Sequence, residues 1–233
     1  MKICGNRECE DALSFSKNVV IRLWGHWCLK AIATILFMVI FFSVYLYLLK
    51  NSYFSMTQMP LTVVDNRIGF QPYFLYFYLS LWVYVSLVPA LMKTKKELIH
   101  YGIYIGMVCS VGIGIYILFP TSIPKSGINW SLYPEFSSLK AIDTSGNAFP
   151  SLHVATAFFS LFWFDRLLKE MHAHRSLLWL NGIWCFGIVY STMAIKQHVF
   201  LDVVGGLILG GVFALLTLHY HRIRFPSSEK VLE

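Results

Sequence analysis

The chain has 233 residues, of which 57% are hydrophobic and only 13% are charged. This composition excludes an ordinary soluble domain and indicates an integral membrane protein. The formal net charge of +7 at pH 7 is explained by attraction to anionic lipid headgroups, so the sequence gives no reason to expect a nucleic-acid partner.

Residues 1–26 are polar and mixed in charge, and we expect a cytoplasmic segment that lies partly on the membrane surface. The apolar run after it is longer than the hydrophobic region of a cleaved signal peptide, so it is interpreted as a signal anchor. Six apolar segments are each long enough to cross a hydrocarbon core of about 30 Å as a helix. They cover residues 27–49, 72–92, 101–119, 151–168, 177–195 and 199–219.

These segments predict an all-α integral membrane protein, a bundle of six transmembrane helices. The bundle covers residues 27–221, followed by a cytoplasmic tail at 222–233. Asp165 and Arg166 interrupt the fourth segment, so a short re-entrant piece is an alternative there. Lysine and arginine are concentrated on one side, which predicts that both termini are cytoplasmic. The outer loops hold only Lys50, Arg67, Lys125, Lys140 and Lys196.

Two groups of residues in these segments have simple structural interpretations. The aromatic residues that open the second segment predict an interfacial belt, with substrate binding as the alternative; they are Tyr73, Phe74, Tyr76, Phe77 and Tyr78. Glycines in the third and sixth segments predict close helix contacts within one bundle; they are Gly102, Gly106, Gly112, Gly114, Gly205, Gly206, Gly210 and Gly211. The long outer loop at 120–150 predicts a functional segment.

Two histidines stand at the mouths of apolar segments, and both are candidate catalytic residues. His153 follows Pro150 at the start of the fourth segment, and His198 precedes the sixth. Asp202 lies four residues after His198, on the same face of a helix. A carboxylate in that position orients an imidazole, which can act as a nucleophile or a proton donor near neutral pH.

The predicted topology brings these groups together. Segments four and six both run from outside to inside, so His153 and His198 open onto the same outer face. Helix N-termini favour a bound anion, and Lys125 and Lys196 add two cations. We therefore predict a cationic pocket for phosphate, although Lys125 has the alternative of being merely solvated. A rival constellation on the inner face is a four-imidazole metal site made by His172, His174, His219 and His221.

At these residues the chain resembles the type 2 phosphatidic acid phosphatase superfamily. Its second motif, Pro-Ser-Gly-His, is similar to residues 150–153, with Leu152 in place of glycine. Its third motif, Ser-Arg, five residues, His, three residues, Asp, is similar to residues 191–202, with Thr192 in place of arginine. The first motif is absent in its standard form. Residues 116–125 instead resemble the branch that contains the inositol phosphorylceramide and sphingomyelin synthases.

The resemblance implies a reaction and a set of roles. His198 attacks phosphorus to give a phosphohistidine, Asp202 orients it, and His153 protonates the leaving oxygen. Phosphate oxygens are expected to be bound by Lys125, Lys196, Ser151, Ser191 and the backbone at Leu152. No metal and no cofactor are expected. Water then hydrolyses the intermediate.

The predicted enzyme is thus a metal-independent hydrolase in the bilayer of a bacterial cytoplasmic (inner) membrane, with its active site on the outer, periplasmic face. Candidate substrates are phosphatidic acid, phosphatidylglycerol phosphate and polyprenyl diphosphate. Because Leu152 and Thr192 depart from the phosphatase motifs, a phospholipid headgroup phosphotransferase of the synthase type is one alternative. A non-catalytic lipid-phosphate binder or transporter is another. The natural lipid and the oligomeric state are left open.

Overall fold

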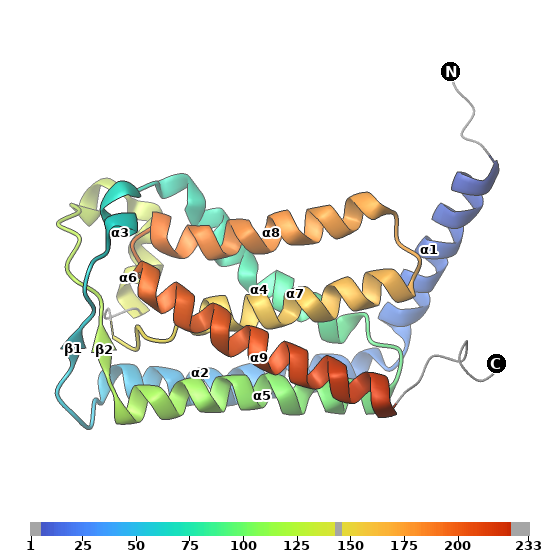
Figure 1. Cartoon of the computed structure of the whole chain (residues 1–233), viewed down its shortest axis with the longest axis horizontal. Helices are drawn as coiled ribbons and strands as arrows, with labels where there is room; N and C mark the ends of the chain where they lie inside the picture. The colour runs from blue at the N-terminus through green and yellow to red at the C-terminus, as the bar shows by residue number, and fades with distance from the viewer. Residues whose placement is uncertain (1–5, 143–145, 225–233) are drawn as a thin grey trace, which may run out of the picture.

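The computed structural model describes residues 6–142 and 146–224, and side chains for residues 14–141 and 146–220. Long helices lie side by side along the longest axis of the molecule (Figure 1). They are α2 (Trp27–Lys50), α4 (Leu75–Ala90), α5 (Lys95–Leu118), α7 (Leu152–Glu170), α8 (Arg175–Ala194) and α9 (Phe200–Arg224). A further helix, α1 (Asn6–Trp24), projects from one end of the bundle (Figure 1).

Five of the described helical segments are long and apolar enough to cross a membrane. They are Trp27–Lys50, Pro72–Ala90, Lys95–Leu118, Arg175–Ala194 and Phe200–Tyr220. Helix α7 has 19 residues but is not among them, because Asp165, Arg166, Lys169 and Glu170 crowd its last turns. The predicted helical membrane protein is therefore supported, whereas the sixth span remains a prediction.

Hydrophobic runs locate the helices better than they locate helix ends. Helix α5 begins at Lys95, ahead of the predicted residue 101, because a capping box starts it there. The Thr94 hydroxyl accepts from the Glu97 N–H at 3.2 Å, and the Glu97 carboxylate accepts from the Thr94 N–H at 3.3 Å. Helix α9 continues to Arg224, so the predicted boundary at residue 222 falls inside a helix. The remainder of the predicted tail, 225–233, lies outside the described residues.

The two ends of the bundle differ in what they carry. One end, called the loop end below, carries β1 (Thr57–Gln58), α3 (Val63–Arg67), β2 (Thr121–Ser122), η2 (Trp130–Leu132), η3 (Pro134–Phe136) and α6 (Ser137–Ile142). The opposite end, called the terminal end, carries α1 and the last turns of α9 (Figure 1). The described residues thus start and finish at the same end of the bundle.

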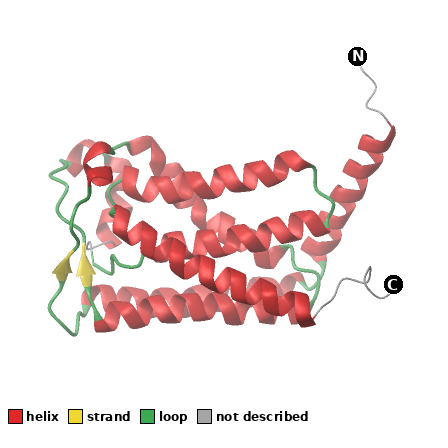
Figure 2. Ribbon diagram, viewed as in Figure 1, coloured by secondary structure: helices red, strands yellow, loops and turns green. Residues whose placement is uncertain are grey.

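Two short strands tie the long connections together at the loop end (Figure 2). Strands β1 and β2 pair in parallel, and the Thr57 N–H donates to the Pro120 carbonyl at 3.0 Å. Ser122 forms a further bridge to Gly146. The connections at 51–71 and 119–150 therefore support each other, and the second one delivers the chain to the start of α7.

Helix α7 lies at the centre of the bundle and packs most closely on α9. Two glycines of α9 make this approach possible. A Cβ on Gly206 would lie 2.5 Å from the Ser151 carbonyl oxygen, and one on Gly210 would lie 2.3 Å from the Ala155 carbonyl oxygen. The predicted glycine contact is confirmed for α9 and for Gly112 of α5, where a Cβ would lie 2.5 Å from the Leu152 side chain. It is wrong for Gly102 and Gly114 of α5, whose Cβ positions have nothing within 4 Å.

Candidate active site

His153 lies in the first turn of α7, and the preceding loop fixes where that turn begins. The Thr121 hydroxyl of β2 accepts from the Phe149 N–H at 2.8 Å. Ser151 is the N-cap residue, and its hydroxyl accepts from the Val154 N–H at 3.3 Å. The loop that precedes α7 and the cap that starts it therefore hold His153 at the loop end.

His198 lies in the tight turn between α8 and α9. The N–H groups of Gln197 and His198 both donate to the Thr192 carbonyl, at 2.9 and 3.0 Å, which closes the end of α8. On the other side of the turn, the Asp65 carboxylate accepts from the Phe200 N–H at 2.7 Å. Because the backbone is held on both sides of His198, its imidazole has a defined position.

The two imidazoles approach each other although they come from different helices. The ring centroids of His153 and His198 are 5.8 Å apart, and the ring planes are inclined by 57°. The backbones of the two helices are also joined directly, because the Ser151 N–H donates to the Asp202 carbonyl at 3.0 Å. The prediction that His153 and His198 open onto one face is therefore matched by their positions.

Asp202 lies behind His198 and is fully buried. His198 Nδ1 is 3.4 Å from Asp202 Oδ2, which is long for a hydrogen bond. That oxygen accepts from the Val199 N–H at 3.0 Å. Among the described residues, His198 Nδ1 and Asp202 Oδ1 have no hydrogen-bond partner. A proton on Nδ1, facing the carboxylate, leaves the lone pair of Nε2 for the opposite side of the ring.

A cavity of about 250 Å³ opens beside the two histidines. Its walls come from α2, α4, the η3–α6 segment, and the starts of α7 and α9. It is lined by Phe42, Tyr45, Leu46, Leu49, Leu75, Tyr78, Leu79, Trp82, Glu135, Ser138, Leu139, Gly146, His153, Gln197 and His198. One side of this cavity is polar and the rest is apolar or aromatic, which suits an amphiphilic ligand.

The aromatic residues that open α4 divide between two surroundings. Tyr73 and Tyr76 are 83% and 75% exposed, as an interfacial belt requires. Tyr78 is only 4% exposed, and its ring stacks on His153 with the centroids 4.6 Å apart. Trp82 meets the same imidazole at 5.7 Å in an edge contact. Tyr78 therefore lines the cavity beside His153, and the alternative of substrate binding stays a prediction for it.

One of the N–H groups expected to bind phosphate at the start of α7 has another partner. The Ser151 N–H donates to the Asp202 carbonyl, as described above. The Tyr116 hydroxyl donates to the Pro150 carbonyl at 2.7 Å. The prediction that the Ser151 N–H binds phosphate is therefore corrected, whereas the same prediction for the Leu152 N–H stays a prediction. At Ser151 the hydroxyl proton is the donor that remains.

The two predicted cations do not line the cavity. Lys125 is exposed on the loop after β2. The Lys196 ammonium donates to the backbone carbonyls of Ile68 and Asp65, the latter at 3.3 Å, and so closes the end of α3. A cation that compensates helix carbonyls is held away from a phosphate, so the structure does not bring Lys125 or Lys196 to the histidines.

Ser191 is also turned away from the cavity. It is fully buried in α8, and its hydroxyl donates to the Ile188 carbonyl at 2.6 Å. The Thr192 hydroxyl makes the same kind of bond to the Val189 carbonyl at 2.8 Å. Both hydroxyls are used within their own helix, and the structure does not bring Ser191 to the cavity beside the histidines.

The described cavity lining includes neither lysine nor arginine, whereas it does include the carboxylate of Glu135. Within the described lining, the fixed source of positive potential is therefore the N-terminal ends of α7 and α9. The rival metal site gains no support: within the described residues no group of three or more His, Cys, Asp or Glu is placed to hold a metal ion. The side chain of His221 lies outside that set.

Some residues that build the site were not predicted. Asp65 fixes the start of α9, and it was signalled by the Thr62-x-x-Asp65 pattern of a capping box, which the structure contains. Tyr116 and Thr121 were noted only as part of a similar stretch. Their contacts join segments that are far apart in the sequence, so no local pattern could reveal them.

Comparison with known families adds one finding. A model of the PAP2 superfamily matches residues 98–226, more than half of the chain. No curated protein and no solved structure matches the chain. The matched region begins in α5 and holds both histidines and Asp202. It leaves out α2 and α4, whose side chains form the aromatic wall of the cavity.

Proposed function

Because the chain belongs to the PAP2 superfamily, we propose that it is a membrane lipid phosphatase that hydrolyses a lipid phosphate or diphosphate through a phosphohistidine intermediate. Membership supports phosphatase-type activity on lipid phosphates. One observation carries the finer proposal: His153 and His198 lie 5.8 Å apart beside one cavity, with the buried carboxylate of Asp202 behind His198. Phosphatidic acid, phosphatidylglycerol phosphate and polyprenyl diphosphate are the candidate substrates.

In the proposed reaction His198 Nε2 attacks phosphorus, and the bond from phosphorus to the leaving oxygen breaks. His153 donates a proton to that oxygen as it leaves. Water then attacks the phosphohistidine, His153 accepts its proton, and release of phosphate restores His198. Asp202 holds the proton on Nδ1 and stabilises the charge that develops on the ring. No step is assigned to a metal.

The proposal places Ser151 beside the phosphoryl group, as a hydroxyl donor from the cap of α7. Charge on the phosphoryl oxygens is opposed by the imidazolium and by the N-terminal ends of α7 and α9. Tyr78 and Trp82 confine His153 between aromatic rings, which limits how far the proton donor can swing.

We also propose that α7 is the sixth span and that both termini are cytoplasmic, so that the loop end faces outward from a bacterial inner membrane. The charged last turns of α7 then lie on the inner side, where Arg166 and Lys169 satisfy the positive-inside rule. The test labels Lys125→Cys and Lys169→Cys with a membrane-impermeant maleimide in intact cells. We expect that only Lys125→Cys is labelled more strongly than the chain with its natural cysteines alone. Labelling of Lys169→Cys alone would reverse the orientation.

The activity test incubates detergent-purified protein with a panel of lipid phosphates, with and without a chelator, and follows free phosphate and lipid products together. We expect chelator-resistant phosphate release that is lost in His198→Ala. His219→Ala is the matched control, because His219 is an exposed histidine on α9, the helix that follows His198. Full activity of His198→Ala on every substrate would refute the nucleophile assignment. Tight binding without product or phosphohistidine would favour the non-catalytic alternative.

A second candidate is a phospholipid headgroup phosphotransferase, and the charge of the cavity favours it. A phosphate monoester carries a charge of about −1.5 to −2 at neutral pH, whereas a phosphodiester carries one negative charge. The described residues that line the cavity include Glu135 but no lysine or arginine. Such a lining suits the single negative charge of a phosphodiester better than the larger charge of a monoester. In that reaction His198 attacks the phosphorus of a phosphodiester lipid, diacylglycerol leaves with the proton from His153, and a lipid alcohol then takes the headgroup phosphoryl from His198 while His153 accepts its proton. A new phospholipid without free phosphate identifies this activity when a phosphodiester lipid and a lipid alcohol are added to the same assay.

A further inference from the structure

Helix α2 is packed at its two ends and open in its middle. Of its side chains only Lys30, near the start, and Leu48 and Leu49, near the finish, are buried. Phe37, Phe41 and the other residues between them that face the bundle are only half-buried. A helix against a filled core would bury this stripe. The middle of α2 therefore borders a space that protein atoms do not fill.

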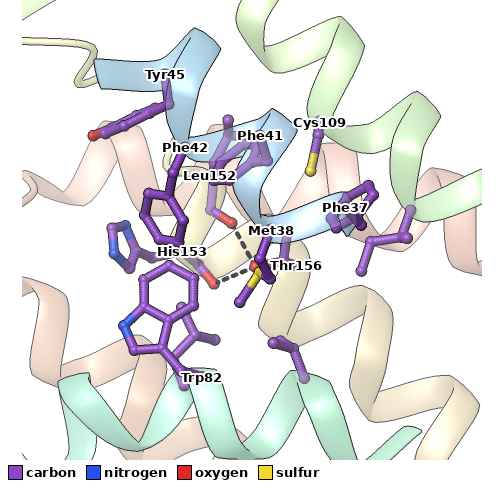
Figure 3. A pocket seen from close by; sticks show the side chains of 13 residues that line it. Phe37, Met38, Phe41, Phe42, Tyr45, Trp82, Cys109, Leu152, His153 and Thr156 are labelled. Carbon is purple, nitrogen blue, oxygen red and sulfur yellow. Dashed lines mark hydrogen bonds between the residues drawn. The ribbon is translucent and has the colours of Figure 1, made fainter. Parts of the chain in front are cut away.

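That space is a second cavity, of about 50 Å³, between α2, α4, α5 and α7. Its lining is almost wholly apolar: Phe37, Met38, Phe41, Phe42, Tyr45, Leu81, Trp82, Val85, Ile105, Cys109, Leu152, His153 and Thr156. The Thr156 hydroxyl points back to the carbonyls of Leu152 and His153, at 2.8 and 3.3 Å, so it offers the cavity no free donor (Figure 3). Apolar cavities of this kind do not hold ordered water.

The second cavity continues from the cavity beside the histidines. The two share Phe42, Tyr45, Trp82 and His153. At their junction the rings of Phe42 and Trp82 meet with centroids 4.9 Å apart, in front of His153 (Figure 3). Leading away from the loop end, the lining runs from Tyr45 to Phe37 along α2. At the rise of an α-helix, the distance from Tyr45 to Phe37 along the helix axis is roughly 12 Å. Half of the thickness of a hydrocarbon core is about 15 Å, so the lining covers most of that depth.

We propose that this second cavity is the binding site for one hydrocarbon chain of the lipid substrate, and that Phe42 and Trp82 form its threshold. The inference rests on the proposed function, because it places the phosphate beside His198 and the attached chain on the other side of His153. A chain leaving the phosphate there has an apolar path along α2 towards the middle of the membrane.

The size of the cavity sets what it can recognise. Its 50 Å³ has room for on the order of four water-sized groups, so it accepts the first few methylene groups and the rest of the chain continues along the open middle of α2. Each buried methylene strengthens binding by about fourfold. A lipid whose chains reach into the cavity is therefore expected to be preferred over a short-chain analogue with the same phosphate.

The test fills the cavity and compares chain lengths. Met38→Trp places an indole in it, and Val85→Phe fills it from the wall on α4. The matched controls are Val39→Trp and Val83→Phe, because Val39 and Val83 are 57% and 58% exposed on the outer faces of the same helices. The readout is the ratio of kcat/KM for dipalmitoyl over dihexanoyl phosphatidic acid in mixed micelles. We expect this ratio to fall about tenfold or more in both filling variants and to stay at the wild-type value in both controls.

A second measurement does not need turnover. In His198→Ala protein, long-chain phosphatidic acid is expected to raise the thermal midpoint more than the short-chain analogue, and adding Met38→Trp or Val85→Phe removes that difference. The same measurement with long and short prenyl diphosphates shows whether the cavity binds an acyl chain or a prenyl chain. If no wild-type turnover is found on any substrate, the proposed function fails while this binding test still stands. An unchanged preference for long chains in both filling variants overturns the cavity assignment.

Discussion

The two ends of the bundle differ in how their charged groups are paired, although Arg166 Nη1 at the terminal end is also without a hydrogen-bond partner among the described residues. At the terminal end, charged side chains from different helices meet partners of opposite charge. Arg166 contacts Glu97 at 2.6 Å and Glu170 at 3.1 Å, and Arg22 of α1 contacts Glu170 at 2.8 Å. The Lys30 ammonium donates to the carbonyls of Arg22 and Ala90. This network joins α1, α2, α4, α5 and α7.

At the loop end, the buried groups are left partly unpaired. His198 Nδ1 and Asp202 Oδ1 are without hydrogen-bond partners in the described part of the chain, although His198 is only 8% exposed and Asp202 is fully buried. Unpaired buried polar atoms cost free energy of folding. They persist where the surrounding structure holds them for another purpose. The terminal end is thus arranged for stability, and the loop end for chemistry.

Asp202→Asn should separate the two ends most clearly. Asparagine keeps an acceptor for the Val199 N–H but does not stabilise a charged His198 ring. We expect turnover to fall by roughly 10³- to 10⁴-fold, while the thermal midpoint stays the same or rises because a buried charge is removed. Phosphate release and thermal unfolding of the same preparation measure both. A large fall in the midpoint would show that Asp202 has a structural role instead.

Gly206→Ala is expected to damage both properties. Its Cβ would lie 2.5 Å from the Ser151 carbonyl, so α7 and α9 must move apart. Such overpacking costs about 1–3 kcal/mol of stability, and a displacement of about 1 Å between His153 and His198 reduces turnover by roughly 10²-fold. Gly102→Ala is the matched control, because that position faces open space. Equal behaviour of the two variants would contradict the close approach.

Arg166→Met should affect stability alone. It leaves Glu97 without its cation at the terminal end, whereas Glu170 keeps its contact with Arg22. The side chains of Arg166, Glu97 and Glu170 are 21%, 9% and 37% exposed. Because solvent reaches these groups, loss of the ion pairs should cost about 1–3 kcal/mol of stability, which is less than for a fully buried ion pair. Turnover per folded molecule should not change. Lys169→Met, which breaks the exposed pair with Asp165, provides the control and should cost no more than about 0.5 kcal/mol.

Tyr116→Phe should have the smallest effect. It removes the hydroxyl that donates to the Pro150 carbonyl at 2.7 Å and supports the start of α7. Loss of one such hydrogen bond should cost about 1 kcal/mol of stability. If the loss also displaces His153, turnover should fall by up to about tenfold. Tyr47→Phe, at an exposed tyrosine of α2, should leave both quantities unchanged. A loss above 10²-fold for Tyr116→Phe would mean that the hydroxyl touches the substrate.

The sequence predicted the parts of this arrangement that depend on periodicity and topology. Apolar runs located the long helices, and the direction of the chain through them placed His153 and His198 at one end. The parts that depend on tertiary hydrogen bonds were missed. Nothing local distinguishes Lys196, which closes α3, from a cation that faces phosphate. The ion pair between Glu97 and Arg166 joins residues from separate helices, so it was equally hidden.

Trapping of the phosphoryl-enzyme identifies the nucleophile directly. Protein is mixed with phosphatidic acid labelled on phosphorus, quenched in base, and digested, and the labelled peptide is identified by mass spectrometry. Base-stable, acid-labile label is expected on His198, absent in His198→Ala and present in His219→Ala. Label on a different residue, or product formation by His198→Ala at the wild-type rate, would contradict this expectation.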